Sequence, residues 1–234
     1  MKKLGIIGGM SWESTQTYYR YLNEGVRARR GGLHSLELLL YSFDFAEIAA
    51  LQANGDWSQA TNEIVKAGLS LKAAGADMLL IATNTMHKMA DDLAAQTQLP
   101  LIHIADATAH AIKEKQCQSP LLLATNFTMT QPFYKGHLAD KHGISVVTPQ
   151  DDHRTIIHDI IYQELCRGII SDTSKQDYLA IIQDYQARGM IDSVILGCTE
   201  IGLLLSQDDC ALPVFDTTAI HCDYALDKLL DESA

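Results

Sequence analysis

Residues 76–85 read ADMLLIATNT, and residues 191–200 read IDSVILGCTE. Each stretch has an Asp at its second position, then a short apolar run, a small residue and a polar turn. An apolar run of this length between turn residues is typical of a buried strand in a parallel sheet. The repetition predicts two similar halves, in which Thr83 and Cys198 hold equivalent positions after a strand. Chance similarity is the alternative, because strand–turn–helix units resemble one another in any α/β protein.

The repeat extends on both sides of these stretches. Each copy continues to a Leu-Pro pair at 99–100 or 212–213 and then to an Asp, at Asp106 or Asp216. GIIGGM at 5–10 likewise resembles LLLATN at 121–126. We therefore expect one α/β domain from residues 1–98 with about 210–234, and a second from 99–209, with equivalent turns facing an interface.

Short apolar runs alternate with segments of helical period along the whole chain. This alternation predicts an α/β fold of two pseudo-symmetric domains, each with a mainly parallel sheet. The expected strands are residues 4–7, 36–41, 78–82, 101–104, 121–124, 145–147, 193–196 and 214–215. The expected helices are residues 15–27, 59–74, 85–95, 107–115, 151–167, 175–187 and 218–230.

Composition narrows the class of protein. The 234 residues are 47% hydrophobic and 20% charged, which is an ordinary globular balance. The formal net charge of -11, without any basic run, argues against nucleic-acid and anionic-membrane partners. No segment approaches the ~20 apolar residues of a membrane span. A small molecule is the expected partner.

The five cysteines form no C-x-x-C pair and no zinc-like Cys/His spacing. The N-terminal MKKLGIIGGM is too short and too glycine-rich for a secretory signal. We expect free thiols in a reducing cytosol.

Ligands of open α/β sheets bind beyond the carboxyl ends of the strands. Met10, Thr83, Thr125 and Cys198 are expected there. Thr199 and Glu200 can open a helix after Cys198, and the positive end of that helix would lower the thiol pKa from ~8.5. Cys198 is therefore the candidate base or nucleophile, whereas the other cysteines are expected to be inert buried residues.

Several motifs together resemble one known family. GGMSWEST at 8–15, ATNTMH at 82–87, TNFTM at 125–129, IIYQELCRG at 160–168 and ILGCTEI at 195–201 are similar to the aspartate/glutamate racemases. The resemblance implies two pseudo-symmetric domains with the active site between them, no pyridoxal phosphate or metal, and a homodimer. It also implies two cysteines on opposite faces of the substrate, one removing the α-proton and the other returning a proton.

The chain departs from that pattern at Thr83, where the first motif usually has its cysteine. A threonine hydroxyl is a poor general base, although it can relay or donate a proton. The resemblance therefore implies racemisation of aspartate or glutamate by Cys198. It also implies lopsided catalysis, in which Cys198 deprotonates the L enantiomer efficiently and the D enantiomer reacts slowly.

The resemblance also supplies candidates for substrate binding: Met10, Gln52, Asn84, Thr85, Thr125, Thr128, Thr199 and Glu200. Helix capping is the alternative for Asn84 and Thr85, and a solvated helix face is the alternative for Gln52. Some relatives place an Arg where Ile48 falls, so the group that binds the side-chain carboxylate is open, with Arg154 and Arg167 as substitutes. His87 could assist Thr83 or be simply hydrogen-bonded, and Trp12 could line the pocket entrance or merely pack.

Two competing functions stay open. A decarboxylase or another single-cysteine member of the same superfamily would also use Cys198 to protonate a planar intermediate. An amino-acid-binding protein would keep the pocket without turnover. The preferred amino acid is also open among aspartate, glutamate and a broader set that includes homoserine.

Overall fold

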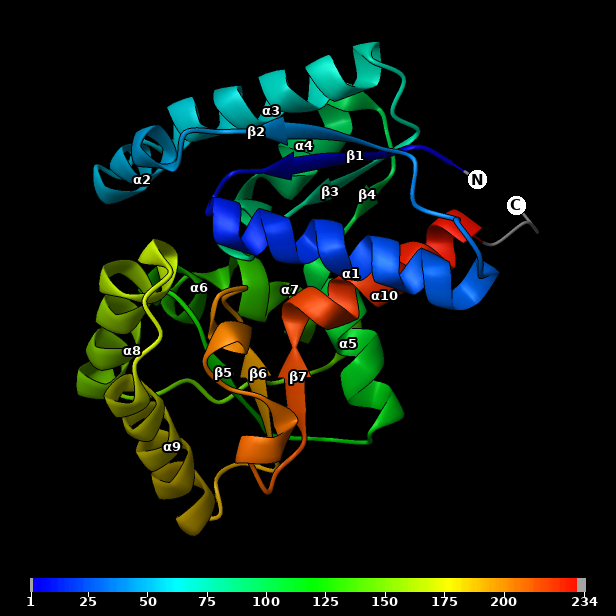
Figure 1. Cartoon of the computed structure of the whole chain (residues 1–234). Coiled ribbons are helices and arrows are strands. Elements are labelled where there is room, and N and C mark those ends of the chain that lie inside the picture. The colour runs from blue at the N-terminus through cyan, green and yellow to red at the C-terminus, as the bar shows by residue number, and fades with distance from the viewer. Residues whose placement is uncertain (1, 231–234) are drawn as a thin grey trace. The chain divides into compact units, whose positions relative to one another are not determined.

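The computed structural model describes residues 2–230, which fall into two compact units (Figure 1). The first unit runs to His103 and resumes at His221, and the second comprises Ile104–Ile220. We had expected the divisions at 98 and about 210. They lie later because strand β4 (Leu101–Ile102) pairs with the first sheet and strand β7 (Val214–Asp216) pairs with the second.

The first unit is built on a four-stranded parallel sheet of order β2-β1-β3-β4. Its remaining elements are β1 (Leu4–Gly8), α1 (Trp12–Arg30), β2 (Leu38–Ser42), α2 (Phe45–Ala53), α3 (Trp57–Ala73), β3 (Met78–Ile81), the 3-10 helix η1 (Thr85–Met89), α4 (Ala90–Thr97) and most of α10 (Thr217–Leu230).

Alternate residues of this sheet face two separate cores. Leu4 and Leu80 pack into a cluster with α1 and α10, whereas Ile7 and Leu79 pack into a cluster with α3 and α4. Helices α1 and α3 accordingly lie on opposite faces of the sheet in Figure 1. Burial on both faces explains why the central strands read as unbroken apolar runs.

The second unit has a three-stranded parallel sheet of order β5-β6-β7 and a single core. Its remaining elements are α5 (Ile104–Glu114), β5 (Pro120–Leu123), α6 (Asn126–Thr130), α7 (Pro132–His142), α8 (Asp151–Gln163), the 3-10 helix η2 (Leu165–Arg167), α9 (Asp172–Ala187), β6 (Ser193–Leu196) and the 3-10 helices η3 (Ile201–Leu203) and η4 (Gln207–Asp209).

The backbone confirms the internal repeat in the sequence. Asp77 Oδ2 accepts the Lys3 N–H just before β1 at 2.7 Å, and Asp192 Oδ2 accepts the Gln118 N–H just before β5 at 2.5 Å. The N–H groups of Leu79 and Val194 each donate to the proline carbonyl at the head of the next strand, at 2.9 Å in both copies. Thr83 and Cys198 therefore follow equivalent strands.

One detail of the proposed repeat is wrong. Leu101 pairs with Leu79 and Val214 pairs with Val194, so the counterpart of Asp216 is the residue two after Leu101, which is His103. Asp106 lies three residues further along, in the first turn of α5.

Several element boundaries also differ from expectation. No strand forms at 145–147, because only Val147 makes an isolated bridge, to Leu121. The sequence missed α2, α6 and α7. The expected helices at 85–95 and 151–167 each divide into a 3-10 segment and an α-helix, and α5 begins at Ile104 rather than at residue 107.

Candidate active site

Cys198 lies at the carboxyl end of β6, directly after Gly197, and is buried with 8% of its surface exposed. The sheet approaches Gly197 so closely that a Cβ on this residue would come within 2.6 Å of Leu122 Cδ1. The glycine therefore lets β6 pack tightly against β5 at the point where the thiol leaves the strand.

A buried carboxylate contacts the thiol. Cys198 Sγ donates to Glu200 Oε2 at 2.9 Å, and Thr199 Oγ1 donates to the same oxygen at 2.9 Å. Only 2% of Glu200 is exposed. Two donors to one oxygen stabilise a buried negative charge. Glu200 was expected to bind substrate, and in the structure its Oε2 is the hydrogen-bond partner of the sulfur.

The pKa of Cys198 is raised well above its usual value, first by burial and then by the negative charge of Glu200. This contradicts the lowering expected from a helix dipole. Thr199 and Glu200 lie in a turn, and the helix after them is the three-residue 3-10 segment Ile201–Leu203, which carries no appreciable macrodipole. The resting sulfur is therefore a thiol.

Two tyrosines belong to the same low-dielectric environment. The pKa values of Tyr162 and Tyr178 are both raised, chiefly by burial and then by the nearby Cys198 and Cys166, whose ionised forms would repel a phenolate. Cys166 was expected to be inert, yet it also contributes to the raised pKa of Cys198. Sequence reasoning placed none of these three residues near the thiol, because they come from α8, η2 and α9.

Thr125 and Thr128 follow the neighbouring strand β5. Thr125 caps α6, its Oγ1 accepting the Thr128 N–H at 3.4 Å, and the two hydroxyl oxygens lie 3.1 Å apart. Both residues are buried. His158 Nδ1 accepts the Asn126 N–H at 3.3 Å, and burial lowers the pKa of His158. The second unit thus presents the predicted hydroxyls after β5 and the thiol after β6, together with a histidine of α8 that the sequence did not indicate.

In the first unit, the candidate site residues also lie directly after strands of the sheet. Met10 follows β1, and Thr83, Asn84 and Thr85 follow β3, all of them buried. Gly9 between β1 and Met10 has a φ of 81°, and a Cβ there would lie 2.4 Å from the backbone of Phe43. Only glycine fits this turn, which explains the Gly-Gly pair.

His87 contacts the main chain of Thr83 rather than its hydroxyl. His87 Nδ1 donates to the Thr83 carbonyl oxygen at 2.8 Å. Its ring packs edge-on against His103, with ring centroids 4.6 Å apart. These contacts support the structural reading of His87, since they hold the backbone of Thr83 in place.

Gln52 is not on a solvated helix face. It is 4% exposed, and its Nε2 lies 3.1 Å from Met86 Sδ. Ile48, on the same helix, is buried in the apolar cluster with α3, so no cation stands there.

The remaining candidates lie on the surface or have other partners. Arg154 pairs with Asp151 and donates to the Pro149 carbonyl oxygen at 2.7 Å, and Arg167 is exposed. Trp12, at the start of α1, is 64% exposed.

The family model for Asp/Glu/Hydantoin racemases matches residues 7–225 of the chain. The chain belongs to this family. It is similar to the crystal structure of "a putative Asp/Glu racemase from Yersinia pestis", with 53% identity, a TM-score of 0.90 and coverage of 99% of this chain and 100% of that one. An aspartate racemase homologue from Pyrococcus horikoshii is 35% identical, with a TM-score of 0.84 and coverage of 99% and 100%.

A curated relative of this racemase family is more distant in sequence. The broad specificity amino-acid racemase of Bacillus subtilis is 18% identical over 225 residues, which is 92% of this chain and 93% of the relative. Family membership and the structural relatives support an amino-acid racemase activity. Among residues 2–230, no helix is long and apolar enough to cross a membrane.

Proposed function

We propose that this protein is a cofactor-independent racemase of acidic amino acids in which Cys198 exchanges the α-proton. The family supports the reaction class, and the hydrogen bond between the buried Cys198 thiol and the Glu200 carboxylate is the observation that carries the mechanism. A thiol held against a carboxylate has a proton acceptor built in.

Glu200 provides the route to the reactive form. The thiol proton moves to Glu200 Oε2, which leaves a thiolate and a carboxylic acid. The transfer shifts one negative charge from oxygen to sulfur and creates no second charge, so it avoids the cost of two buried anions. The thiolate then takes the α-hydrogen, forming the S–H bond and leaving the electron pair on the α-carbon.

Thr83 serves the opposite face in this proposal. Its hydroxyl relays a proton, giving its own to the planar carbon and taking one from a water molecule in the same step, which inverts the centre without leaving an alkoxide. The hydroxyl takes a proton from carbon poorly. Cys198 therefore exchanges the α-hydrogen of the enantiomer whose α-hydrogen faces the sulfur, which we propose is L. This exchange is faster than the inversion of the same enantiomer. Because both enantiomers have equal free energy, kcat/KM for racemisation is the same in both directions, so the asymmetry appears in isotope exchange.

We propose that hydroxyl and amide groups bind the carboxylates of the substrate. The candidates are Met10, Gln52, Asn84, Thr85, Thr125, Thr128 and Thr199. With Ile48 buried in apolar packing and Arg154 paired with Asp151, no dedicated cation is assigned to the side-chain carboxylate. Preference for acidic over neutral amino acids should then be modest, because neutral hydrogen bonds to a carboxylate are weaker than charged pairs.

Chiral chromatography of aspartate and glutamate tests the function. Each pure enantiomer should become a mixture with the wild-type protein but not with Cys198→Ser. Release of carbon dioxide would identify the decarboxylase instead, and substrate binding without conversion would identify an amino-acid-binding protein.

The family resemblance also leads us to propose a homodimer that works in the reducing cytosol. Light scattering during gel filtration would measure a mass near twice 25.8 kDa if this is so. A monomer at micromolar concentration would contradict the dimer.

A further inference from the structure

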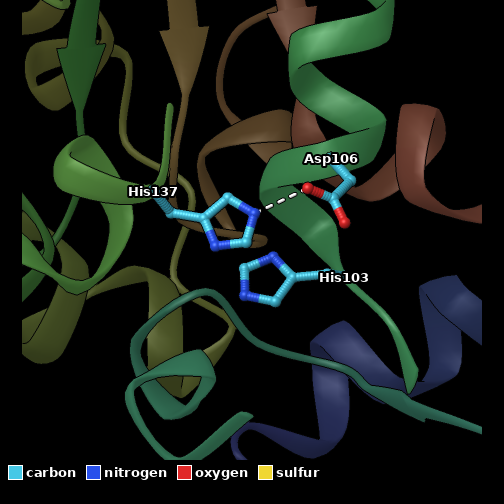
Figure 2. A group of neighbouring side chains, drawn as sticks. All are labelled: His103, Asp106 and His137. Atoms are coloured by element: carbon cyan, nitrogen blue, oxygen red, sulfur yellow. Dashed lines mark hydrogen bonds and ion pairs between the residues drawn. The ribbon is translucent and has the colours of Figure 1, made fainter. Parts of the chain in front are cut away.

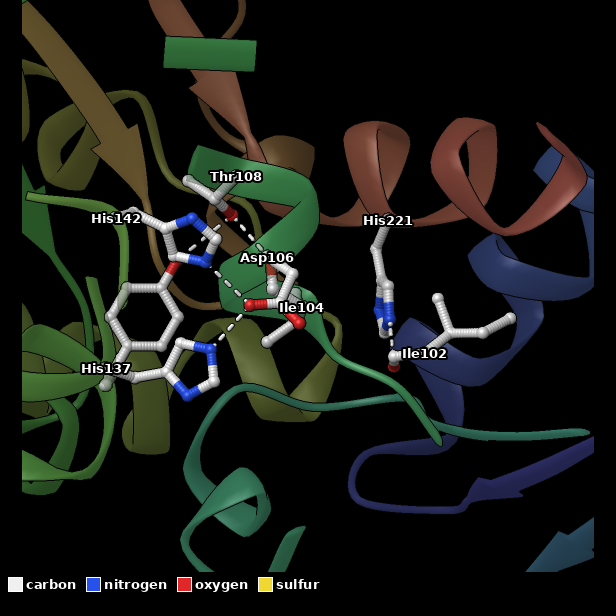
Figure 3. A network of polar contacts seen from close by, with 8 residues as sticks. Ile102, Ile104, Asp106, Thr108, His137, His142 and His221 are labelled. Atoms are coloured by element: carbon white, nitrogen blue, oxygen red, sulfur yellow. Dashed lines mark hydrogen bonds and ion pairs between the residues drawn. The ribbon is translucent and has the colours of Figure 1, made fainter. Parts of the chain in front are cut away.

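Two histidines of one helix converge on a single carboxylate oxygen. His137 Nε2 and His142 Nε2, both from α7, lie 2.6 and 2.7 Å from Asp106 Oδ1, which belongs to the first turn of α5 (Figure 3). The three side chains are 10%, 22% and 35% exposed, respectively. They therefore form a partly buried group of nitrogen and oxygen donors at the contact between the two helices.

A third imidazole stands beside this group. His103, the last residue before α5, is neighbour to Asp106 and His137 in Figure 2, and one ligand atom from each lies within 4.8 Å of the others. Because His103 precedes Asp106 by only three residues, the chain itself holds the two side chains close.

We propose that His103, Asp106, His137 and His142 form a zinc site. Imidazole nitrogen and carboxylate oxygen are ordinary Zn²⁺ ligands, at about 2.0–2.2 Å from the ion, and four such ligands complete a tetrahedron. An imidazole-rich set favours Zn²⁺ over Mg²⁺ or Ca²⁺, which prefer oxygen ligands alone.

The contacts of Asp106 with His137 and His142 need to open only slightly to admit an ion. Tetrahedral ligands at these bond lengths are about 3.3 Å apart. The imidazole nitrogens of His137 and His142 are 2.6 and 2.7 Å from Asp106 Oδ1, so each of these two contacts must lengthen by less than about 1 Å when the ion replaces the two imidazole hydrogen bonds.

A buried hydrogen bond links the two helices that carry Asp106, His137 and His142. Tyr134, one turn before His137 on α7, is fully buried and donates to Thr108 Oγ1 of α5 at 3.1 Å. This bond fixes how α5 lies against α7. Sites built on packed helices hold ligand geometry better than sites on loops. A bound ion would add a further link between the two helices.

None of these four side chains takes part in the proton transfer assigned to Cys198, so the zinc site stands or falls independently of the racemase proposal. The sequence did not reveal it, because its ligands are residues 103, 106, 137 and 142 and match no compact metal motif.

Metal analysis of the full chain tests the proposal. After incubation with Zn²⁺ and gel filtration, the wild-type protein should retain one zinc per chain. His137→Gln and His142→Gln should each lower the affinity by more than the roughly 10- to 100-fold that loss of an outer-shell partner costs. His110→Gln is the matched control, because His110 lies on α5 with its side chain 60% exposed.

Co²⁺ substitution separates this site from adventitious binding by cysteines. Nitrogen and oxygen ligands give visible bands without the strong near-ultraviolet absorption of a cobalt–thiolate bond. The proposal is overturned if the wild-type protein retains no zinc, if the glutamine variants bind it as well as the wild type, or if the bound cobalt shows thiolate absorption. Circular dichroism of each variant identifies any that fail to fold, and Asp106→Asn provides an additional ligand variant.

Discussion

Glu200 Oε2 accepts the Cys198 thiol at 2.9 Å, although only one residue separates the two in sequence. The turn after β6 folds the carboxylate back onto the sulfur. The same contact has two opposite effects on formation of the thiolate. The charge of Glu200 raises the pKa of the thiol, whereas its carboxylate oxygen offers a place for the thiol proton.

Replacing Glu200 by Gln separates these two effects. Loss of the charge should lower the pKa of Cys198, so that iodoacetamide alkylates it faster at pH 8. Loss of the proton acceptor should reduce α-proton exchange by about 10²- to 10⁴-fold, as for other general bases. Mass spectrometry of the Cys198 peptide and proton NMR measure the two effects. If both rates fall together, Glu200 has only a structural role.

The raised pKa of Cys198 predicts a loss of stability in alkali. Above the usual thiol pKa of ~8.5, the unfolded chain loses this proton while the folded chain keeps it. The free energy of unfolding contributed by Cys198 then falls by about 1.4 kcal/mol per pH unit until the folded pKa is reached. Below the usual pKa the contribution is fully present.

Urea titrations between pH 8 and 10 check this slope. Cys210 also has a pKa raised by burial, and it adds to the slope of the wild-type protein. The quantity to compare is therefore the wild type minus Cys198→Ala. Parallel curves for the two proteins would show that Cys198 does not titrate as described.

Much of this arrangement could be predicted from residues alone. The paired stretches at 76–85 and 191–200 identified β3 and β6, and with them Thr83 and Cys198 as equivalent positions, because buried parallel strands have a strong apolar signal. The family motif at 195–201 marked Glu200, but no sequence pattern tells whether its side chain turns toward substrate or toward the preceding sulfur.

Other features depended on tertiary packing. Helix α7 was missed because its polar residues and Gly136 give it a weak periodic signal, although Pro132 at its first turn and Gly143 at its end are ordinary boundary residues. The contact of His137 and His142 with Asp106 arises only when α7 packs on α5. The expected lowering of the Cys198 pKa failed because burial and Glu200 outweigh a three-residue 3-10 helix.

Thr83→Cys should restore a second base. A thiol in place of the hydroxyl should speed α-proton exchange of the D enantiomer by about 10²-fold or more, with a smaller effect on the L enantiomer. Thr83→Ser retains a hydroxyl and is the matched control. NMR of each enantiomer in deuterated water measures the ratio, and an unchanged ratio in Thr83→Cys would remove Thr83 from the mechanism.

Gly197→Ala should damage both folding and catalysis. Its Cβ would lie 2.6 Å from Leu122 Cδ1 and 3.1 Å from Ala124 Cβ, an overpacking that typically costs about 1–3 kcal/mol. Gly136→Ala on α7 is the control, because its nearest neighbour is 3.5 Å away and alanine favours helix by up to about 1 kcal/mol. Thermal melts should rank Gly197→Ala below and Gly136→Ala at or above the wild type, and equal melting temperatures would contradict the close packing at Gly197.

The most direct measurement of the central claim is α-hydrogen exchange of L- and D-aspartate in deuterated water, followed by NMR with wild-type protein and with Cys198→Ser. The mechanism predicts deuterium entry into L-aspartate faster than its conversion to D-aspartate, slower entry into D-aspartate, and none with the serine variant. Exchange that persists without the sulfur, or that proceeds equally for both enantiomers, would contradict it.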